Sequence, residues 1–241
     1  MKRARKIRGF GLVELMVAMA AGLVVMGALL AFITATAQSS RTNIRSTRMM
    51  QELRRSMNLV EREIRRSGFD QNARNFVGTC VNVTTPGACP QSNFNSLVIS
   101  SSSCLVVAYD NAANTTPGTI SAGEYHGFRR QTNAAGIGVI QASLAGATVP
   151  DCSEAYGSGN WSDVTDPRII DVTSLNFTQP TAFGGCVSTA SGLWLVVQDV
   201  LVQMGGQWVD PGDNKVTRRA IEQSIRVKND RVSTTRPSIC T

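Results

Sequence analysis

Residues 10 to 37 are the feature that most constrains how this 241-residue chain can fold. The stretch contains a single charged residue, Glu14, and no proline. A helix needs about 20 apolar residues to cross the hydrocarbon core of a bilayer, so this segment is long enough to span a membrane with some tilt. Five basic residues directly precede it: Lys2, Arg3, Arg5, Lys6 and Arg8. We therefore expect a membrane-spanning helix at residues 10–37.

Glu14, the charged residue inside this stretch, helps to decide which kind of apolar segment it is. A carboxylate within a membrane span costs roughly 2.5–3.5 kcal/mol on insertion scales, so it is retained only for a use. A signal peptide cut after Ala35-Thr36-Ala37 is one alternative, but its apolar region is ordinarily about 7–15 residues long. A plain single-span anchor leaves Glu14 and the Gly9-Phe10 pair unexplained. A buried helix of a soluble protein is disfavoured by the length.

The residues around Glu14 carry a resemblance to a known family. Gly9-Phe10-Gly11-Leu12-Val13-Glu14-Leu15-Met16 closely resembles the class III leader junction of type IV prepilins and type II secretion pseudopilins. In that family a membrane-embedded peptidase cuts after the glycine and N-methylates the new terminal residue. The resemblance implies a leader at residues 1–9, cleavage between Gly9 and Phe10, and pairing of Glu14 with the amino terminus of a neighbouring subunit in a filament.

The helical pattern continues beyond the apolar stretch, through residues 38–67. Leu53, Met57, Val60 and Ile64 recur at spacings of three and four, which predicts one apolar helix face. Ser67-Gly68 supplies a helix end, with cations in the last turn. Six arginines fall on the other side, where they contact solvent, anionic headgroups or acidic faces of neighbouring subunits: Arg41, Arg45, Arg48, Arg55, Arg62 and Arg66. The segment from Glu61 to Phe69 further resembles the helix end of the PilW group of minor pilins.

Residues 68–241 are expected to form a β-rich globular domain, because short strand-like runs alternate there with loops rich in Asn, Thr, Gly, Ser and Pro. The run Leu193–Val197 is the most apolar and is expected at the centre of the sheet. Met204–Gln207 and Asp210–Asn214 are expected to be turns, the second joining the last two long strands. One long helix followed by many strands predicts an α+β fold with an antiparallel sheet, and the family resemblance implies that this fold is type IV pilin-like. The expected strands are Ser96–Ser100, Cys104–Tyr109, Glu124–Arg130, Gly138–Gln141, Ile169–Phe177, Leu193–Met204 and Val216–Val227.

All six cysteines lie beyond the helix and are disulfide candidates: Cys80, Cys89, Cys104, Cys152, Cys186 and Cys240. No C-x-x-C pair occurs and the chain has one histidine, so a structural zinc site is not expected. An even number confined to one domain indicates an oxidising compartment such as the periplasm, with the leader on the cytoplasmic side. Fifteen pairings are possible. We favour Cys80 with Cys89 across the Pro86-Gly87 turn, then Cys186 with Cys240, which leaves Cys104 with Cys152.

Charge and motif content argue against nucleic-acid binding and against catalysis. The formal net charge is +7, but residues 68–241 hold 11 basic and 13 acidic residues. Such a domain does not offer a broad phosphate-binding surface. His126 stands without a G-x-S-x-G motif, and Asp210, Asp213 and Asn214 lack the spacing of an EF-hand loop. We expect no enzyme activity, no cofactor and no metal.

The sequence thus predicts a minor pilin, similar to the PilW group, that helps to initiate or cap a type IV pilus. Its expected partners are the prepilin peptidase, the major and other minor pilins, and the inner-membrane assembly platform. The expected location is the inner membrane, crossed once with a periplasmic domain, and afterwards the pilus on the cell surface. Alternatives are a J-type pseudopilin of type II secretion, an adhesive or DNA-uptake module with a patch at Arg129-Arg130 or Arg218-Arg219, and a secreted enzyme released after Ala37.

Overall fold

The computed structural model describes most of the chain, in two compact units, Met1–Thr47 and Arg48–Thr241. The expected cleavage junction, Gly9-Phe10, lies outside the described residues, as do Cys80, Cys89 and Cys240. For Cys186 only the backbone is described. The described residues are 11–71, 94, 97–111, 120–146, 148–179, 186–188, 194–209, 214–229 and 231–233.

Helix α1 runs from Leu12 to Arg66, and its part in the first unit is apolar as far as Ala37. Residues 11–41 are all exposed. By length and composition α1 is a helix that can cross a membrane. The structure thus confirms a helix from Leu12 onward, whereas its crossing of a membrane stays a prediction. Phe10 itself lies outside the described residues.

The part of α1 in the second unit buries the predicted face. Leu53, Val60 and Ile64 are fully buried and Met57 is 3% exposed. The helix ends where the sequence predicts, because Gly68 takes a positive φ of 75° and breaks the helical backbone. The Gly68 amide then donates a hydrogen bond to the carbonyl of Ala108 in a strand, which fixes the exit of the chain.

Eleven strands follow among the described residues, and every pairing between them is antiparallel. One sheet has the order β1-β2-β3-β4-β5, formed by Leu97–Ser101, Cys104–Ala108, Tyr125–Thr132, Gly138–Gly146 and Trp161–Asp163. The second has the order β10-β9-β6, formed by Val216–Arg226, Asp199–Val209 and Asp171–Thr178. The third has the order β11-β8-β7, formed by Arg231–Ser233, Trp194–Val196 and Cys186–Ser188. The α+β expectation is confirmed.

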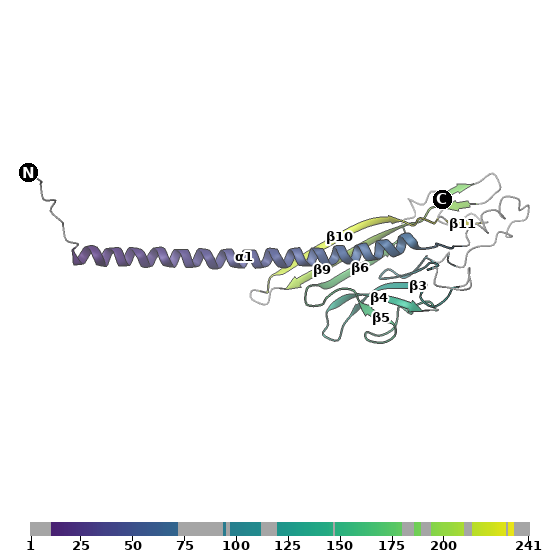
Figure 1. Ribbon diagram of the computed structural model, residues 1–241, viewed down its shortest axis with the longest axis horizontal. Coiled ribbons are helices and arrows are strands. Elements are labelled where there is room, and N and C mark those ends of the chain that lie inside the picture. Colours follow the sequence, from purple (N-terminus) through teal and green to yellow (C-terminus); the bar gives the residue numbers. More distant parts are fainter. Residues whose placement is uncertain are drawn as a thin grey trace, which may run out of the picture. The chain divides into compact units, whose positions relative to one another are not determined.

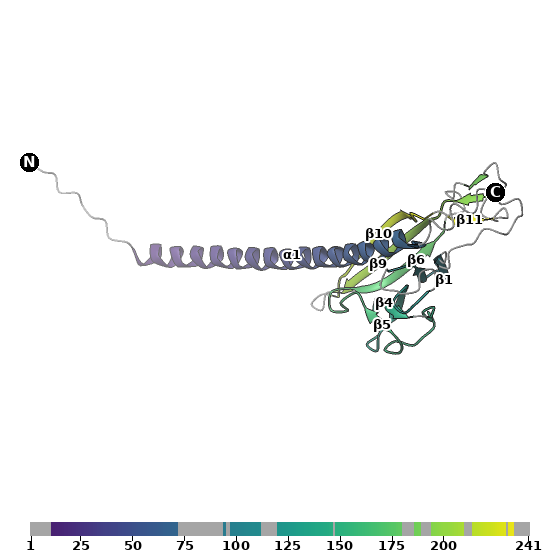
Figure 2. The same ribbon diagram turned by 45° about the vertical axis from the view of Figure 1, so that its right-hand side comes forward.

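One hydrophobic core joins the helix to the two larger sheets. In both views the end of α1 lies along β10, β9 and β6 (Figures 1 and 2). Its buried face meets Leu105 and Phe128 of the five-stranded sheet and Val202 and Ile225 of the β10-β9-β6 sheet. A bond from the Phe177 amide to the Ser102 carbonyl, 2.7 Å, links the two sheets directly. The C-terminal part of α1 is thus an integral layer of the second unit.

The expected single strand over Leu193–Met204 is wrong. The structure has two strands there, β8 and β9, in different sheets, and β8 is central only in the small β11-β8-β7 sheet. The ladder is interrupted because Arg226 pairs with Asp199 and Arg231 with Val196, so that four residues on one side correspond to two on the other. The extra residues place Asn229 so that its side-chain amide donates to the Ser67 carbonyl at the end of α1, at 2.8 Å.

The expected turn at Met204–Gln207 is also wrong, since these residues lie inside β9. Gly205 and Gly206 allow Ser174 and Ile170 to pack closely against the β9 backbone. A Cβ at Gly206 would lie 2.3 Å from Ile170 Cδ1, and a Cβ at Gly205 would lie 2.5 Å from Ser174 Oγ. The turn expected at Asp210–Asn214 agrees with the register, because Val209 pairs with Val216 across the β9–β10 hairpin. Residues 210–213 lie outside the described ones.

Candidate functional site

The first candidate site is the start of α1, where Glu14 lies in the first helical turn. The Leu15 amide bonds to the Gly11 carbonyl at 3.2 Å, and the Gly11 amide points at Glu14 Oε2 at 3.5 Å. Amide groups in the first turn of a helix have no partner within the helix, and the helix dipole favours an anion beside them. The carboxylate therefore turns back toward the end of the chain at which Phe10 would become the amino terminus.

The surface beyond Glu14 is an uninterrupted apolar one. Its large side chains are 52–77% exposed between Leu12 and Ile33. An exposed apolar patch of this extent marks a membrane or protein contact. The side chains are Leu12, Val13, Leu15, Met16, Val17, Met19, Leu23, Val24, Val25, Met26, Leu29, Leu30, Phe32 and Ile33.

Two glutamates on the buried face of α1 escaped the sequence analysis. Glu63 is 5% exposed and accepts a hydrogen bond from the Tyr109 hydroxyl at 2.6 Å. Glu52 is 9% exposed and accepts one from the Asp166 amide at 3.2 Å. Both bonds connect the helix to the β-rich part of the second unit. Their spacing could have revealed them, because Glu52 and Glu63 lie at positions of the helix that fall on its apolar face.

The end of α1 adjoins an aromatic pair. The rings of Tyr109 and His126 stack with centroids 4.5 Å apart and planes 3° from parallel. The Arg66 guanidinium lies 5.7 Å from the Tyr109 centroid, and all three residues line a pocket of about 580 Å³. Burial lowers the pKa of His126, and burial together with the Glu63 carboxylate raises the pKa of Tyr109 to about 12. As expected from the sequence, His126 is a strand residue, the second of β3.

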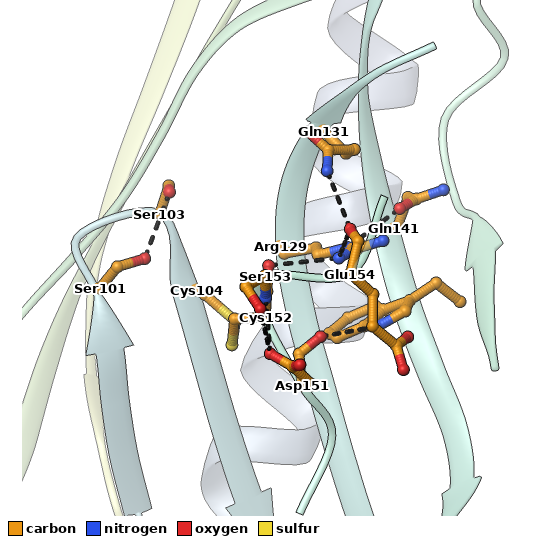
Figure 3. The surroundings of a disulfide bond; sticks show 11 residues. Ser101, Ser103, Cys104, Arg129, Gln131, Gln141, Asp151, Cys152, Ser153 and Glu154 are labelled. Atoms are coloured by element: carbon orange, nitrogen blue, oxygen red, sulfur yellow. Dashed lines mark hydrogen bonds between the residues drawn. A yellow bond between two sulfur atoms is a disulfide. The ribbon is translucent and has the colours of Figure 1, made fainter. Parts of the chain in front are cut away.

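The disulfide between Cys104 and Cys152 is one of the three pairs favoured from the sequence, and it is confirmed. The Cα atoms are 6.2 Å apart, and the bond ties β2 to the loop between β4 and β5 (Figure 3). We call residues 150–160 of that loop the clamp loop. The other two favoured pairs involve cysteines outside the described side chains.

A buried arginine holds the clamp loop beside the disulfide. Arg129, on β3, is 1% exposed and donates through Nη1 to the carbonyls of Cys152, at 3.2 Å, and Glu154, at 2.6 Å (Figure 3). Its Nε donates to Gln141 Oε1 at 3.0 Å. The guanidinium also lies 4.3 Å from the Trp161 ring centroid. Burial lowers the pKa of Arg129, whereas the nearby carboxylates of Glu154 and Asp151 oppose that shift.

Further contacts fix the first half of the clamp loop. Gln131 Nε2 donates to the Glu154 carbonyl at 3.1 Å, and Trp161 Nε1 donates to the Asp151 carbonyl at 3.2 Å. Gly127 of β3 makes room for this arrangement, since a Cβ there would lie 2.8 Å from the Trp161 ring. The loop is irregular in backbone yet held at several points. Arg129 and Arg130 are thus structural: Arg130 Nε donates to the Val172 carbonyl at 2.7 Å.

Comparison with protein families gives two matches. Residues 42–227 match the family of prepilin peptidase-dependent protein B, and residues 4–30 match the prokaryotic N-terminal methylation motif. No curated protein and no solved structure matches the chain. The methylation motif covers Gly9, Phe10 and Glu14. The larger match covers the end of α1 and the strands through β10, including the disulfide and the clamp loop.

Proposed function

Since the chain belongs to the prepilin peptidase-dependent protein B family, a pilin-like family, we propose that it is a minor pilin that takes part in type IV pilus assembly or initiation at the pilus tip. We place it, within this proposal, in the PilW group. The observation that carries the proposal is the N-terminal methylation motif at residues 4–30, directly ahead of the family domain on the same chain.

The proposed sequence of events uses residues at the start of α1. The apolar segment inserts into the membrane, and the prepilin peptidase cuts between Gly9 and Phe10. The freed ammonium of Phe10 on one subunit then pairs with the Glu14 carboxylate of the next. The exposed position of Glu14 in the first turn supports this role, because its carboxylate faces the Gly11 amide beside the expected new amino terminus. The same pairing would serve a pseudopilin of a secretion machine.

The first experiment is identification of the mature N-terminus of the membrane-extracted protein by mass spectrometry. We expect N-methylated Phe10. Gly9→Val should leave the leader uncut, because a bulky side chain replaces the small residue at the junction. Gly22→Val is the matched control, since a Cβ at Gly22 meets nothing within 4 Å. A terminus at Gln38 would indicate a secreted domain, and an intact Met1 a plain anchor; either result contradicts the proposal.

A second experiment separates processing from assembly. Glu14→Ala should be cut and methylated normally but should be depleted from sheared filaments, because the carboxylate acts only after cleavage. Glu14→Asp keeps the charge and should assemble better than Glu14→Ala. Normal incorporation of Glu14→Ala would refute the pairing. A wild-type chain that is absent from pili but needed for protein export would assign the subunit to a secretion machine.

A further inference from the structure

The outer part of the clamp loop has the composition of a binding loop. Residues 155–160 read Ala-Tyr-Gly-Ser-Gly-Asn, and all six are exposed. Tyr, Ser, Gly and Asn dominate recognition loops because tyrosine gives a large contact area at low entropy cost, while the others adapt their hydrogen bonds. The Tyr156 hydroxyl donates a hydrogen bond to Asp163 Oδ2 at 2.7 Å, and the Ser158 hydroxyl donates one to the Ala155 carbonyl. Both bonds stay within this loop and the adjoining strand β5.

The clamp beneath this segment lowers the cost of binding through it. The Cys104–Cys152 disulfide and the two carbonyl contacts of Arg129 fix the loop before any partner arrives. Ordering a loop on association costs free energy, so a loop that is already fixed binds more tightly with the same contacts. A covalent bond and a buried guanidinium thus hold an irregular loop whose outer residues are exposed to solvent.

The charge around the loop indicates a cationic partner. Residues 150–164 contain three acidic residues and no lysine, arginine or histidine. Asp151 and Asp163 are exposed, and Glu154 is half-buried. Complementary charge steers association and fixes its register. Arginine suits such a site best, because its guanidinium binds carboxylates through two parallel bonds and stacks on aromatic rings such as Tyr156.

The same chain offers an arginine row on α1. Arg48, Arg55 and Arg62 are seven residues apart, so they lie along one helix face about 10 Å from each other. The side chains of Arg55 and Arg62 are 84% and 59% exposed. Their ion pairs among the described residues go to Glu52 and Glu63, whose side chains are 12% and 6% exposed. The accessible charge of this row is therefore positive.

We propose that the clamp loop of one copy docks onto the arginine row of a second copy. Tyr156 and the carboxylates of Asp151 and Glu154 would contact the guanidinium groups. The two surfaces differ, so the interface is heterologous: each docked copy keeps one free loop or one free row, and the contact can propagate. This inference goes beyond the proposed function, since it requires neither cleavage of the leader nor Glu14.

The test is site-specific photo-cross-linking of the full-length protein in detergent micelles, with p-benzoylphenylalanine in place of the exposed Asn160. Unlabelled and ¹⁵N-labelled copies are mixed, so that mass spectrometry separates cross-links between copies from those within one. We expect cross-links to residues 48–62 of another copy, in a series of dimers, trimers and larger species. Salt at 0.5 M should weaken them, because it screens exposed charges.

Charge reversal on the two surfaces makes the test specific. Glu154→Arg keeps the backbone carbonyl that Arg129 holds, and Arg55→Glu changes an exposed side chain. Each variant alone should lose about tenfold or more of the cross-links, because like charges then face each other. In a mixture of the two variants with the probe on the Arg55→Glu copy alone, the cross-links should return as dimers without higher species, since its intact loop meets the intact row of the Glu154→Arg copy, which carries no probe. Matched controls on β10 are Glu222→Arg and Arg219→Glu, both at exposed positions.

Three results would overturn the inference: cross-links confined within single chains, no cross-links between copies, or cross-links between copies that Arg55→Glu does not reduce. The uncut Gly9→Val chain should cross-link as the wild type does. That arm separates failure of this interface from failure of the proposed maturation.

Discussion

The two parts of α1 belong to one helix but are specified by the sequence in different ways. Up to Ala37 the helix is apolar around its whole circumference apart from Glu14 in its first turn, and residues 11–41 are exposed on every side. From Arg48 onward one face is buried in a shared core and the other carries arginines. The first part is adapted to a surrounding that is itself apolar. The second part is adapted to one particular set of neighbours.

The comparison teaches that the same residue type has different consequences in the two parts. A leucine in the first part contributes to total hydropathy, so its exact position matters little. A leucine in the second part occupies one site in a packed core, where a lost methyl group leaves a cavity. The effect of substituting a glycine or a glutamate likewise depends on which of the two parts contains it. Each of the following substitutions therefore has a counterpart in the other part, or a readout confined to one of them.

The largest effect is expected from a core leucine. Leu53→Ala should lower the free energy of unfolding of the second unit by about 2–5 kcal/mol, because Leu53 is fully buried. Leu23→Ala, at a position 73% exposed, should leave it unchanged. Thermal unfolding of the full-length protein in detergent, followed by near-ultraviolet circular dichroism, measures both. Equal shifts for the two variants would contradict the distinction between the two parts.

Removal of the disulfide should come next. Cys104→Ala combined with Cys152→Ala opens a link across 48 residues and should cost roughly 2–4 kcal/mol. The readout is the unfolding midpoint of the second unit, compared with that of the wild type with and without reductant. The helical signal of the apolar segment should persist in both proteins after the second unit unfolds. A simultaneous loss of that signal would show that the two parts unfold together.

Glycine substitutions should differ in sign between the two parts. Gly206→Ala places a methyl group against Ile170 and should destabilise the second unit by about 1–3 kcal/mol, the usual cost of overpacking. Gly22→Ala meets nothing within 4 Å and should favour the helix, because alanine has the higher helix propensity. Chemical unfolding curves of the two variants provide the comparison. A neutral Gly206→Ala would mean that β9 and β6 are less closely packed there.

The smallest effect concerns the buried carboxylate of the second part. Tyr109→Phe leaves Glu63 with Arg62 as its partner, so we expect a loss of about 1 kcal/mol at neutral pH. The pKa of Tyr109 is raised to about 12, above the value of about 10 in an unfolded chain. Its contribution is therefore complete below pH ~10 and is lost as the pH rises toward ~12.

The pH profile distinguishes this bond from general alkaline unfolding. Asp163 also raises the pKa of Tyr156, so part of the alkaline loss persists in every variant that keeps Tyr156. The difference between wild type and Tyr109→Phe should shrink between pH ~10 and ~12, as measured by unfolding midpoints at each pH. A difference that stays constant through that window would show that the hydroxyl does not bond to Glu63.

Local sequence patterns predicted what depends on near neighbours in the chain. The spacing of Leu53, Met57, Val60 and Ile64 predicted the buried helix face, and Ser67-Gly68 predicted its end. The long strands β3, β4, β6 and β10 were also anticipated, because each extends over enough residues to show a pattern. The strands β5, β7 and β11 were not anticipated, because three residues are too few to show an alternating pattern.

Features set by distant contacts could not be predicted in this way. Gly205-Gly206 has the local character of a turn, and only the approach of Ile170 and Ser174 shows why glycine is needed inside a strand. From the sequence, Arg129-Arg130 was a candidate patch of an adhesive or DNA-uptake module, whereas the structure buries Arg129 under the clamp loop. In each case the deciding neighbour lies tens of residues away along the chain.

The absence of a linker between the two parts of α1 has a mechanical consequence. Tension transmitted from the apolar part reaches the second unit through the helix backbone at Arg48. To withdraw the helix lengthwise, the load must shear eight buried side chains together, from Met49 to Ile64, along with the bonds of Glu52 and Glu63. Contacts loaded in parallel share a force, whereas contacts peeled in series fail one at a time. The helix is therefore held in the second unit by contacts that are distributed over more than four turns.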